Sequence, residues 1–365
     1  MISTNHMSPE QLFAFWPKAT FAHYQQLINL CGNLETAFKA SEKQLLELKW
    51  QGQVLPSFLE WRANAKQIAT NWQEKFAREK ITFTVYGSSD FPHNKFIGMK
   101  DPPYVLFIRG NPRFNSPSLA VVGSRNCTEY GIKATNYLIP DLAASGISIV
   151  SGLAGGIDST AHIAALKARG HTVAILGHGI GWNDLGYNSE RRHLGEKIIE
   201  HGGAIISEYL PGIPGGNFTF PKRNRIIAAL TDATLITEAA EGSGSLITAE
   251  CAHVLHRDVL IVPQDIFSIT GKGANAQLKE AAHPVTCSQD IFELFGITPK
   301  KRRTAPSPIL SNDQSIIFNL LQIEPQGRDS LARELSLAPA SLGVTLTTME
   351  LAGLIEAKNG RYYAL

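Results

Sequence analysis

Four short segments rich in glycine, serine and basic residues carry the side chains best suited to bind an anion. Glycine lets a ligand approach the backbone, a serine hydroxyl donates a hydrogen bond, and a guanidinium can pair with two phosphate oxygens. The segments contain Gly123, Ser124 and Arg125; Ser151, Gly152 and Gly156; Lys222, Arg223, Asn224 and Arg225; and Gly242, Ser243, Gly244 and Ser245. Each alone is also typical of an ordinary turn, but together they predict one site for an anionic ligand.

Three further residues are expected to support this site. Asp158 follows the glycine-rich turn at 151–156 and is expected to cap the next helix, while Glu238 is expected to pair with a basic residue of the site. Phe220, or its neighbour Phe218, has a ring that can stack on a nucleic-acid base. Packing into the core explains either ring equally well, so both interpretations stay open.

The elements that must position these residues form an alternating pattern between residues 81 and 299. Short, nearly continuous apolar runs predict parallel strands buried on both faces; they cover residues 119–122, 147–150, 172–176, 204–206, 234–237 and 259–262. Two more runs, 81–86 and 104–108, are expected to extend the same sheet. The predicted fold is an α/β, extended Rossmann-like, doubly wound sheet. Ligands bind such sheets beyond the carboxyl ends of the strands, where the four segments lie.

Segments with a different sequence pattern flank this predicted sheet. Residues 1–80 show apolar spacing typical of several short helices, which indicates a helical, SAM-like domain. Residues 300–308 combine four basic residues with prolines and are typical of a linker. Residues 309–365 contain three helical stretches followed by a hairpin with an Asn-Gly turn, which predicts a winged-helix domain.

The charge of the winged-helix segment argues against duplex DNA as its ligand. It carries four basic and six acidic residues from position 309 onward. Its expected recognition helix, residues 340–349, contains no lysine or arginine to meet phosphates or guanine edges. We therefore expect this domain to contact protein or to stabilise the molecule.

Composition and motifs exclude several classes of protein. The net charge is only +2, so an anionic partner must be bound through local clusters of basic residues. The phosphate-binding loop of nucleotide hydrolases is incomplete at Gly271, Lys272 and Gly273, which argues against ATP hydrolysis. The turn at 177–181 does not match the dinucleotide-binding fingerprint, which argues against nicotinamide or flavin binding. His162 and His178 lack an evident nucleophile and are interpreted as structural. We expect no cofactor, no metal and no catalytic residue.

Cysteine usage and hydropathy indicate where the protein works. The four cysteines are scattered without a CxxC pair, which is typical of a reducing compartment. The first residues lack the pattern of a secretory leader, and no run of 18 apolar residues occurs. A cytoplasmic protein without membrane insertion is the expectation.

The ordered motifs resemble those of the DNA-processing protein A family, DprA, also called Smf. The resemblance rests on Val-Gly-Ser-Arg at 122–125, Ser-Gly-Leu-Ala at 151–154, Gly-Ile-Asp at 156–158, Phe-Pro-Lys-Arg-Asn-Arg at 220–225 and Ser-Gly-Ser-Leu-Ile-Thr at 243–248. It runs through about residues 81–296, and the flanking segments are similar to accessory domains of many members.

This resemblance implies a function and a set of partners. It implies a dimeric, cytoplasmic, non-enzymatic protein that binds single-stranded DNA, protects incoming strands and helps to load the RecA recombinase during natural transformation. Single-strand-binding protein is a further implied partner. In the family pattern the strand-binding residues correspond to Gly123, Ser124, Arg125 and residues 223–225.

The chain departs from the family pattern at three places. Gly155 stands where members commonly have arginine, residues 179–186 lack an Asp followed by Tyr-Pro, and the loop before Phe220 differs. These differences concern the shape and affinity of the pocket rather than the fold. They are also consistent with a divergent paralogue that has a different cellular task.

Two alternative functions remain at this point. One is a nucleotide-binding protein, or an enzyme that hydrolyses nucleoside monophosphates, on a related Rossmann core; Thr248 stands where such enzymes have a catalytic glutamate, and Glu250 lies close by. The other is an interaction scaffold without a working pocket. A backbone-reading single-strand binder with about four phosphate contacts should instead show a log–log salt slope of about −3.

Overall fold

The computed structural model describes residues 7–186, 189–299, 311–335, 337–358 and 360–364. The chain forms two compact units, Met1–Lys300 and Lys301–Leu365, and each is described by itself. The expected linker at 300–308 lies outside the described residues.

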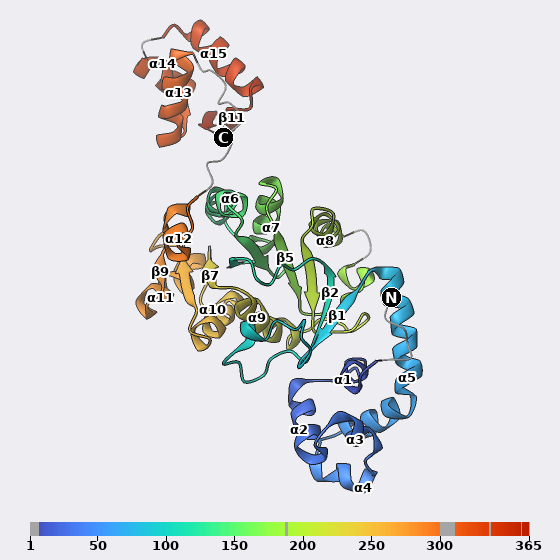
Figure 1. The fold of residues 1–365 in the computed structure, drawn as a ribbon. Coiled ribbons are helices and arrows are strands. Elements are labelled where there is room, and N and C mark those ends of the chain that lie inside the picture. Colours follow the sequence, from blue (N-terminus) through green and yellow to red (C-terminus); the bar gives the residue numbers. More distant parts are fainter. Residues whose placement is uncertain (1–6, 187–188, 300–310, 336, 359, 365) are drawn as a thin grey trace. The chain divides into compact units, whose positions relative to one another are not determined.

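The larger unit is built on a nine-stranded sheet (Figure 1). The strands lie in the order β1-β2-β6-β5-β4-β3-β7-β8-β9. Their bounds are β1 Thr82–Val85, β2 Val105–Gly110, β3 Ser118–Val122, β4 Ser148–Ser151, β5 Thr172–Leu176, β6 Ala204–Ser207, β7 Ala233–Ile236, β8 Asp258–Ile261 and β9 His283–Pro284. The strands from β6 to β9 in this order are parallel, whereas β2 is antiparallel to both β1 and β6. The prediction of an extended, doubly wound sheet is confirmed.

The central strands form because their side chains are apolar on both faces. Every residue of β3, β4, β5, β6 and β7 is buried, as a parallel sheet covered by helices requires. From β3 to β6 the chain builds the sheet in one direction, and it then crosses back to place β7 on the other side of β3. The switch point of the sheet therefore lies between β3 and β7, where ligands bind in this class of fold.

Helices cover both faces of the sheet, as Figure 1 shows. On one face lie α6 (Glu129–Ala144), α7 (Ile157–Lys167) and α8 (Glu190–Glu200). On the other lie α9 (Thr219–Leu230) and α10 (Gly244–Val254). Near the far edge of the sheet follow α11 (Lys272–Gln277) and α12 (Ser288–Phe295).

One element differs from the sequence-based expectation near the site. We expected the basic segment 218–225 to be a loop, but residues 219–225 form the first two turns of α9. Pro221 is tolerated there because the first turn of a helix needs no hydrogen bond from its N–H groups. The helical geometry turns the three consecutive polar residues Arg223, Asn224 and Arg225 in different directions.

The N-terminal helices pack against the sheet through aromatic side chains. They are α1 Pro9–Phe13, α2 Phe21–Cys31, α3 Leu34–Lys39, α4 Glu42–Leu45 and α5 Val54–Glu79. The expectation of short helices throughout is wrong for α5, which continues for 26 residues. Phe13 meets the ring of Tyr104 edge-on at 4.9 Å, and the Tyr104 hydroxyl donates to the Glu10 carbonyl at 2.8 Å. The helices and the first strands thus share one hydrophobic cluster.

The smaller unit has the elements expected of a winged helix. It contains α13 (Asn312–Ile323), α14 (Arg328–Leu335) and α15 (Pro339–Leu351), with β10 (Gln326–Gly327), β11 (Ile355–Lys358) and β12 (Arg361–Ala364) in a small antiparallel sheet. Its own cluster of buried apolar residues, which includes Leu331, Leu346 and Met349, holds it together. No helix among the described residues of either unit is long and apolar enough to cross a membrane.

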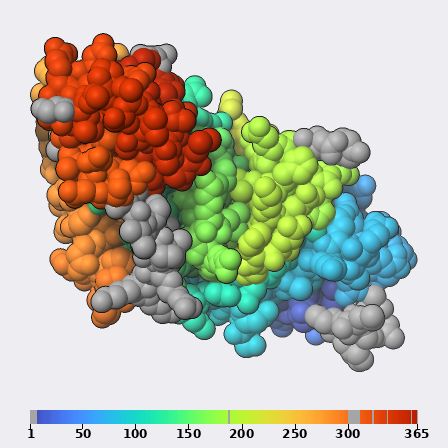
Figure 2. All heavy atoms as spheres, turned by 90° about the horizontal axis from the view of Figure 1, so that it is seen from above, coloured from blue at the N-terminus to red at the C-terminus, as the bar shows by residue number. Residues whose placement is uncertain are grey.

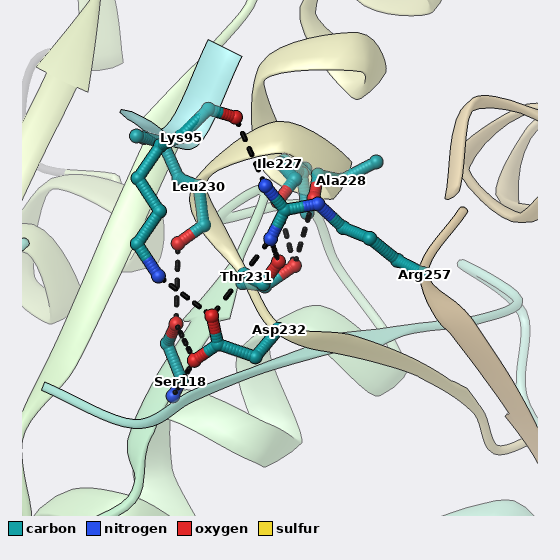
Figure 3. A network of polar contacts seen from close by, with 8 residues as sticks. All are labelled: Lys95, Ser118, Ile227, Ala228, Leu230, Thr231, Asp232 and Arg257. Carbon is teal, nitrogen blue, oxygen red and sulfur yellow. Dashed lines mark hydrogen bonds and ion pairs between the residues drawn. The ribbon is translucent and has the colours of Figure 1, made fainter. Parts of the chain in front are cut away.

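A polar network fixes the end of α9 that lies away from the site (Figure 3). The Asp232 carboxylate accepts hydrogen bonds from Lys95 Nζ at 2.7 Å and from the Ser118 amide at 2.9 Å. The Arg257 guanidinium donates to the Thr231 carbonyl and to the Lys95 carbonyl. Because β3 begins at Ser118, the network ties the C-terminal end of α9 to the start of the strand that leads into the site.

Replacing Asp232 by asparagine should loosen this anchor. Lys95 is only 8% exposed and would lose its carboxylate partner, so we expect Asp232→Asn to lower the free energy of unfolding by about 2 kcal/mol. Urea unfolding followed by circular dichroism measures the change. The control Glu74→Gln removes an exposed charge of α5; an equal loss in both variants would contradict the role of the network.

Candidate nucleic-acid interface

A pocket of about 270 Å³ opens at the switch point of the sheet. The loops after β3 and β4, the start of α9 and the start of α10 all contribute to its wall. Its lining comprises Val122, Gly123, Arg125, Ala154, Asp158, Phe220, Pro221, Arg223, Asn224, Ile227, Ser243, Gly244, Ser245 and Thr248. Three of the four sequence segments contribute expected residues to this lining, and the second contributes Ala154 instead.

The structure brings together only part of the expected set of residues. Gly123, Arg125, Asp158, Phe220, Arg223, Asn224, Ser243, Gly244 and Ser245 line the pocket. The other expected residues are not part of its lining: Ser124, Ser151, Gly152, Gly156, Lys222, Arg225, Glu238 and Gly242. Several of these hold the lining residues in place, as described below.

The buried guanidinium of Arg223 forms the floor of the pocket. Arg223 is 5% exposed, and its Nη1 donates to the carbonyl oxygens of Gly152, at 2.8 Å, and of Ile175. These carbonyls stand at the carboxyl ends of β4 and β5. Burial, together with the charges of Arg125 and Arg191, lowers the pKa of Arg223 to about 10, while the charge of Asp158 opposes the shift. The guanidinium stays charged at neutral pH.

Asp158 is the carboxylate that balances this buried charge. Its Oδ2 accepts from the amides of Gly152 at 3.1 Å and Ala154 at 3.4 Å, so it closes the loop between β4 and α7. Burial raises the pKa of Asp158, whereas Arg223 and the backbone hydrogen bonds lower it. The side chain lies in the first turn of α7, where we expected a cap, but its carboxylate binds the preceding loop instead.

Asn224 links α9 to the fourth segment. Its Nδ2 donates to the Gly244 carbonyl at 2.9 Å, and its Oδ1 accepts from Arg223 Nε at 3.1 Å. Ser243 caps α10, since its hydroxyl accepts from the Ser245 amide. The start of α10 therefore faces the pocket in a fixed position, with the partial positive charge of a helix N-terminus.

Sequence reasoning missed Thr248 as a residue of the pocket. It lines the pocket and is 1% exposed, and its buried hydroxyl has no hydrogen-bond partner among the described residues. A buried hydroxyl of this kind has its donor available for a ligand. The signal in the sequence was its place one turn into the helix that starts at Gly244.

Arg125 is the accessible cation of the pocket. Its side chain is exposed and makes no ion pair among the described residues. The guanidinium lies over the ring of Phe220, 5.5 Å from its centroid. Phe220 is half-buried and orients Arg125, whereas Phe218 is 90% exposed and does not line the pocket.

Lys222 and Arg225 point to a separate acidic pair. Arg225 Nη2 donates to both carboxylate oxygens of Glu208, at 2.8 and 2.9 Å, and lies 3.6 Å from Asp101 Oδ2. Lys222 Nζ lies 3.7 Å from Glu208 and 3.8 Å from Asp101. The structure thus places two of the four expected cations in ion pairs outside the pocket lining.

Glu238 supports the first segment in a way that differs from the expected ion pair. Its buried carboxylate accepts from the amide and the hydroxyl of Thr128, the residue that caps α6. Its backbone carbonyl accepts from the Ser124 amide at 2.8 Å. Gly156 completes this support, because a Cβ there would overlap the carbonyls of Ser124 and Arg125 and its φ is +76°.

The described residues offer little for acid–base or metal chemistry. Burial lowers the pKa of His162 to about 3, and its Nδ1 is paired with the Thr172 hydroxyl at 2.7 Å. Asp158 is the one carboxylate among the described residues of the lining, while Glu250 is exposed and outside it. No group of three or more metal-binding side chains occurs among the described residues.

Comparisons with known proteins all identify similarity to DNA-processing proteins of the DprA and Smf type. A family model described as DNA recombination-mediator protein A matches residues 82–296, and one described as DprA winged helix domain matches residues 301–361. Protein Smf of Escherichia coli (strain K12) is 34% identical over 293 residues, which cover 76% of each chain. The DNA processing protein DprA of Streptococcus pneumoniae is 40% identical over 196 residues, covering 53% of this chain and 68% of that protein.

Two solved structures are similar as well. The X-ray structure of DNA processing protein A from Streptococcus pneumoniae has a TM-score of 0.65 at 29% identity and covers 80% of this chain and 99% of that one. A structure of DNA processing protein A from Helicobacter pylori, reported for its single-stranded DNA binding mode, has a TM-score of 0.52 at 26% identity and covers 60% and 98%.

Gly152 tests the role of the buried guanidinium. A Cβ at this position would overlap the guanidinium of Arg223 and displace it from the strand-end carbonyls. We expect Gly152→Ala to lower the free energy of unfolding by about 2–4 kcal/mol, because a buried charge loses its partners. Gly155→Ala is the matched control in the same loop, since a Cβ there meets open space. Equal stability of the two variants in urea unfolding would contradict the assignment.

Proposed function

Because the chain belongs to the family of DNA recombination-mediator protein A, we propose that its pocket binds single-stranded DNA by the sugar-phosphate backbone. The observation that carries the proposal is Arg125, an exposed cation without a carboxylate partner among the described residues, beside the start of α10. The single-stranded DNA binding mode reported for the Helicobacter pylori relative supports the choice of ligand.

A phosphate group suits the chemistry of the pocket. The start of α10 offers a partial positive charge, Thr248 offers a buried hydroxyl, and Arg125 offers an exposed guanidinium. Arg223 adds a fixed positive charge at the floor of the pocket. Its Nη1 and Nε already donate hydrogen bonds to oxygen atoms of the protein. In this proposal Arg125 contacts the phosphate directly, while Arg223 and Asn224 hold the surrounding loops.

Bases are proposed to stack at the rim. Phe218 presents a ring that is 90% exposed, and base–aromatic stacking contributes about 1–3 kcal/mol per base without sequence preference. Backbone contacts and stacking together make a binder that accepts any sequence. They also favour single strands, because a duplex hides its bases from the ring.

The cellular role follows from this ligand. We propose that the protein covers incoming single strands in the cytoplasm and hands them to the RecA recombinase, with single-strand-binding protein as a second partner. The family is one of recombination mediators, so the pocket binds and does not turn over its ligand. The hydrolase alternative would need a free carboxylate, and Asp158 is bound to two backbone amides.

A homodimer is proposed from an exposed apolar surface in the segment after β8. Ile266, Phe267 and Ile269 are 78%, 85% and 76% exposed there. Apolar groups of this size rarely stay in water as a cluster. A second copy of the chain would cover them.

Replacing Arg125 by alanine should weaken binding of a single strand without harming the fold. A charge-assisted hydrogen bond contributes about 1.5–3 kcal/mol, so we expect at least about tenfold weaker binding of a labelled thymidine oligonucleotide and a salt slope shallower by about 0.7. Fluorescence anisotropy across a salt series measures both quantities.

Arg78→Ala, an exposed position of α5, is the control for net charge. Unchanged affinity of Arg125→Ala, or tighter binding of the duplex than of the single strand, would overturn the proposed function. The melting temperature of Arg125→Ala should stay at the wild-type value because the side chain is exposed.

The dimer surface can be tested by introducing charge. We expect the double variant Phe267→Asp and Ile269→Asp to run as a monomer in size-exclusion chromatography with light scattering, because two carboxylates would lose their hydration in the interface. Ile97→Asp, which alters an equally exposed side chain elsewhere, should keep the wild-type mass. A double variant that remains dimeric would refute this surface.

A further inference from the structure

A second, larger groove lies between α7 and α8. Figure 2 shows the surfaces of these helices side by side, α7 in green and α8 in yellow-green. The groove has a volume of about 1170 Å³, and aliphatic side chains line it, among them Leu153, Ile163 and Leu194. These three residues do not line the pocket at the switch point.

The groove adjoins the pocket at the switch point of the sheet. Ala154 lines both of them, and Gly155 follows it in the groove. A Cβ at Gly155 would meet no atom within 4 Å, so the surface at this junction is open. A flexible polymer seated in the pocket therefore has a free path into the groove.

Basic residues dominate the charge of the groove. Lys167, Arg191 and Lys197 are exposed and make no ion pair among the described residues, and Glu190 is the one carboxylate of the described lining. His193 and His201 add two imidazoles. The charge of Arg191 reaches the pocket, since it contributes to the lowered pKa of Arg223 after burial and Arg125. Both cavities therefore attract anions.

We propose that the α7–α8 groove is a second segment of the single-strand track, in which phosphates of a long strand lie against Lys167, Arg191 and Lys197. The inference rests on the proposed function of the pocket and extends it. The strand leaves the pocket over Ala154 and Gly155, and its bases lie on the aliphatic floor. Only strands longer than the pocket can reach the groove.

A nucleic acid fits the groove better than an acidic peptide does. Both would be attracted by the basic residues, but the shared residue Ala154 links this groove to a pocket lined with phosphate-binding groups. A chain of regularly spaced phosphates can occupy both cavities at once. Binding of an acidic peptide in the groove does not require an adjoining pocket for phosphate.

Strand length separates the groove from the pocket in an experiment. The full chain is titrated with labelled thymidine strands of about 6 and about 20 nucleotides, lengths chosen to fill one or both cavities. The double variant Lys167→Gln and Lys197→Gln is compared with Lys43→Gln and Lys66→Gln, which removes the same charge from exposed positions of α4 and α5.

We expect the groove variant to bind the long strand about tenfold more weakly than the control variant does, with a salt slope shallower by about 1.4 for two lost contacts. The short strand should bind both variants alike. Equal binding of the long strand by the two variants would overturn the proposal. If a labelled glutamate-rich peptide then binds the wild type but not the groove variant, the groove is a peptide site instead.

The same titration distinguishes a failure of the pocket from a failure of the groove. Arg125→Ala should weaken both strand lengths, whereas the groove variant should weaken only the long one. If Arg125→Ala binds both the short and the long strand as tightly as the wild type does, the proposed function itself is rejected. If Arg125→Ala binds the strands more weakly but the groove variant binds the long strand as tightly as its control does, only the extended track is rejected.

Discussion

The buried guanidinium of Arg223 is the constraint on which the site depends. An arginine at 5% exposure needs acceptors for its donors and a nearby negative charge. Here the carbonyls of Gly152 and Ile175 accept from Nη1, the Asn224 side chain accepts from Nε, and the charge of the Asp158 carboxylate favours the charged guanidinium. Those partners stand at the ends of β4 and β5 and at the start of α7. One side chain of α9 therefore sets the spacing of three elements.

The basic residues of the sequence divide into three roles in the structure. Arg223 is buried and structural, Lys222 and Arg225 are paired with Glu208 and Asp101, and Arg125 is exposed beside the start of α10. The buried and the paired cations therefore stabilise the fold around the pocket. The exposed Arg125 is available to bind a phosphate. The groove between α7 and α8 adds cations of the exposed kind.

Sequence reasoning identified the sheet and the pocket because both depend on local patterns. Continuous apolar runs predict buried parallel strands, and strand ends meet at one edge of such a sheet. It could not place Arg225, because Glu208 follows β6, Asp101 precedes β2, and only the fold brings both to α9. It missed that α9 begins at Thr219, since Pro221 and three cations suggested a loop. Thr248 was not counted among the site residues because its place one turn into the helix after Gly244 does not by itself show that the residue lines a pocket.

The most direct measurement is a crystal structure of the full chain with a thymidine oligonucleotide. The account predicts a backbone phosphate at the first turn of α10, within hydrogen-bond distance of the Thr248 hydroxyl and the Arg125 guanidinium, with Arg223 unmoved below it. A strand bound to another surface, with this pocket empty, would contradict the account.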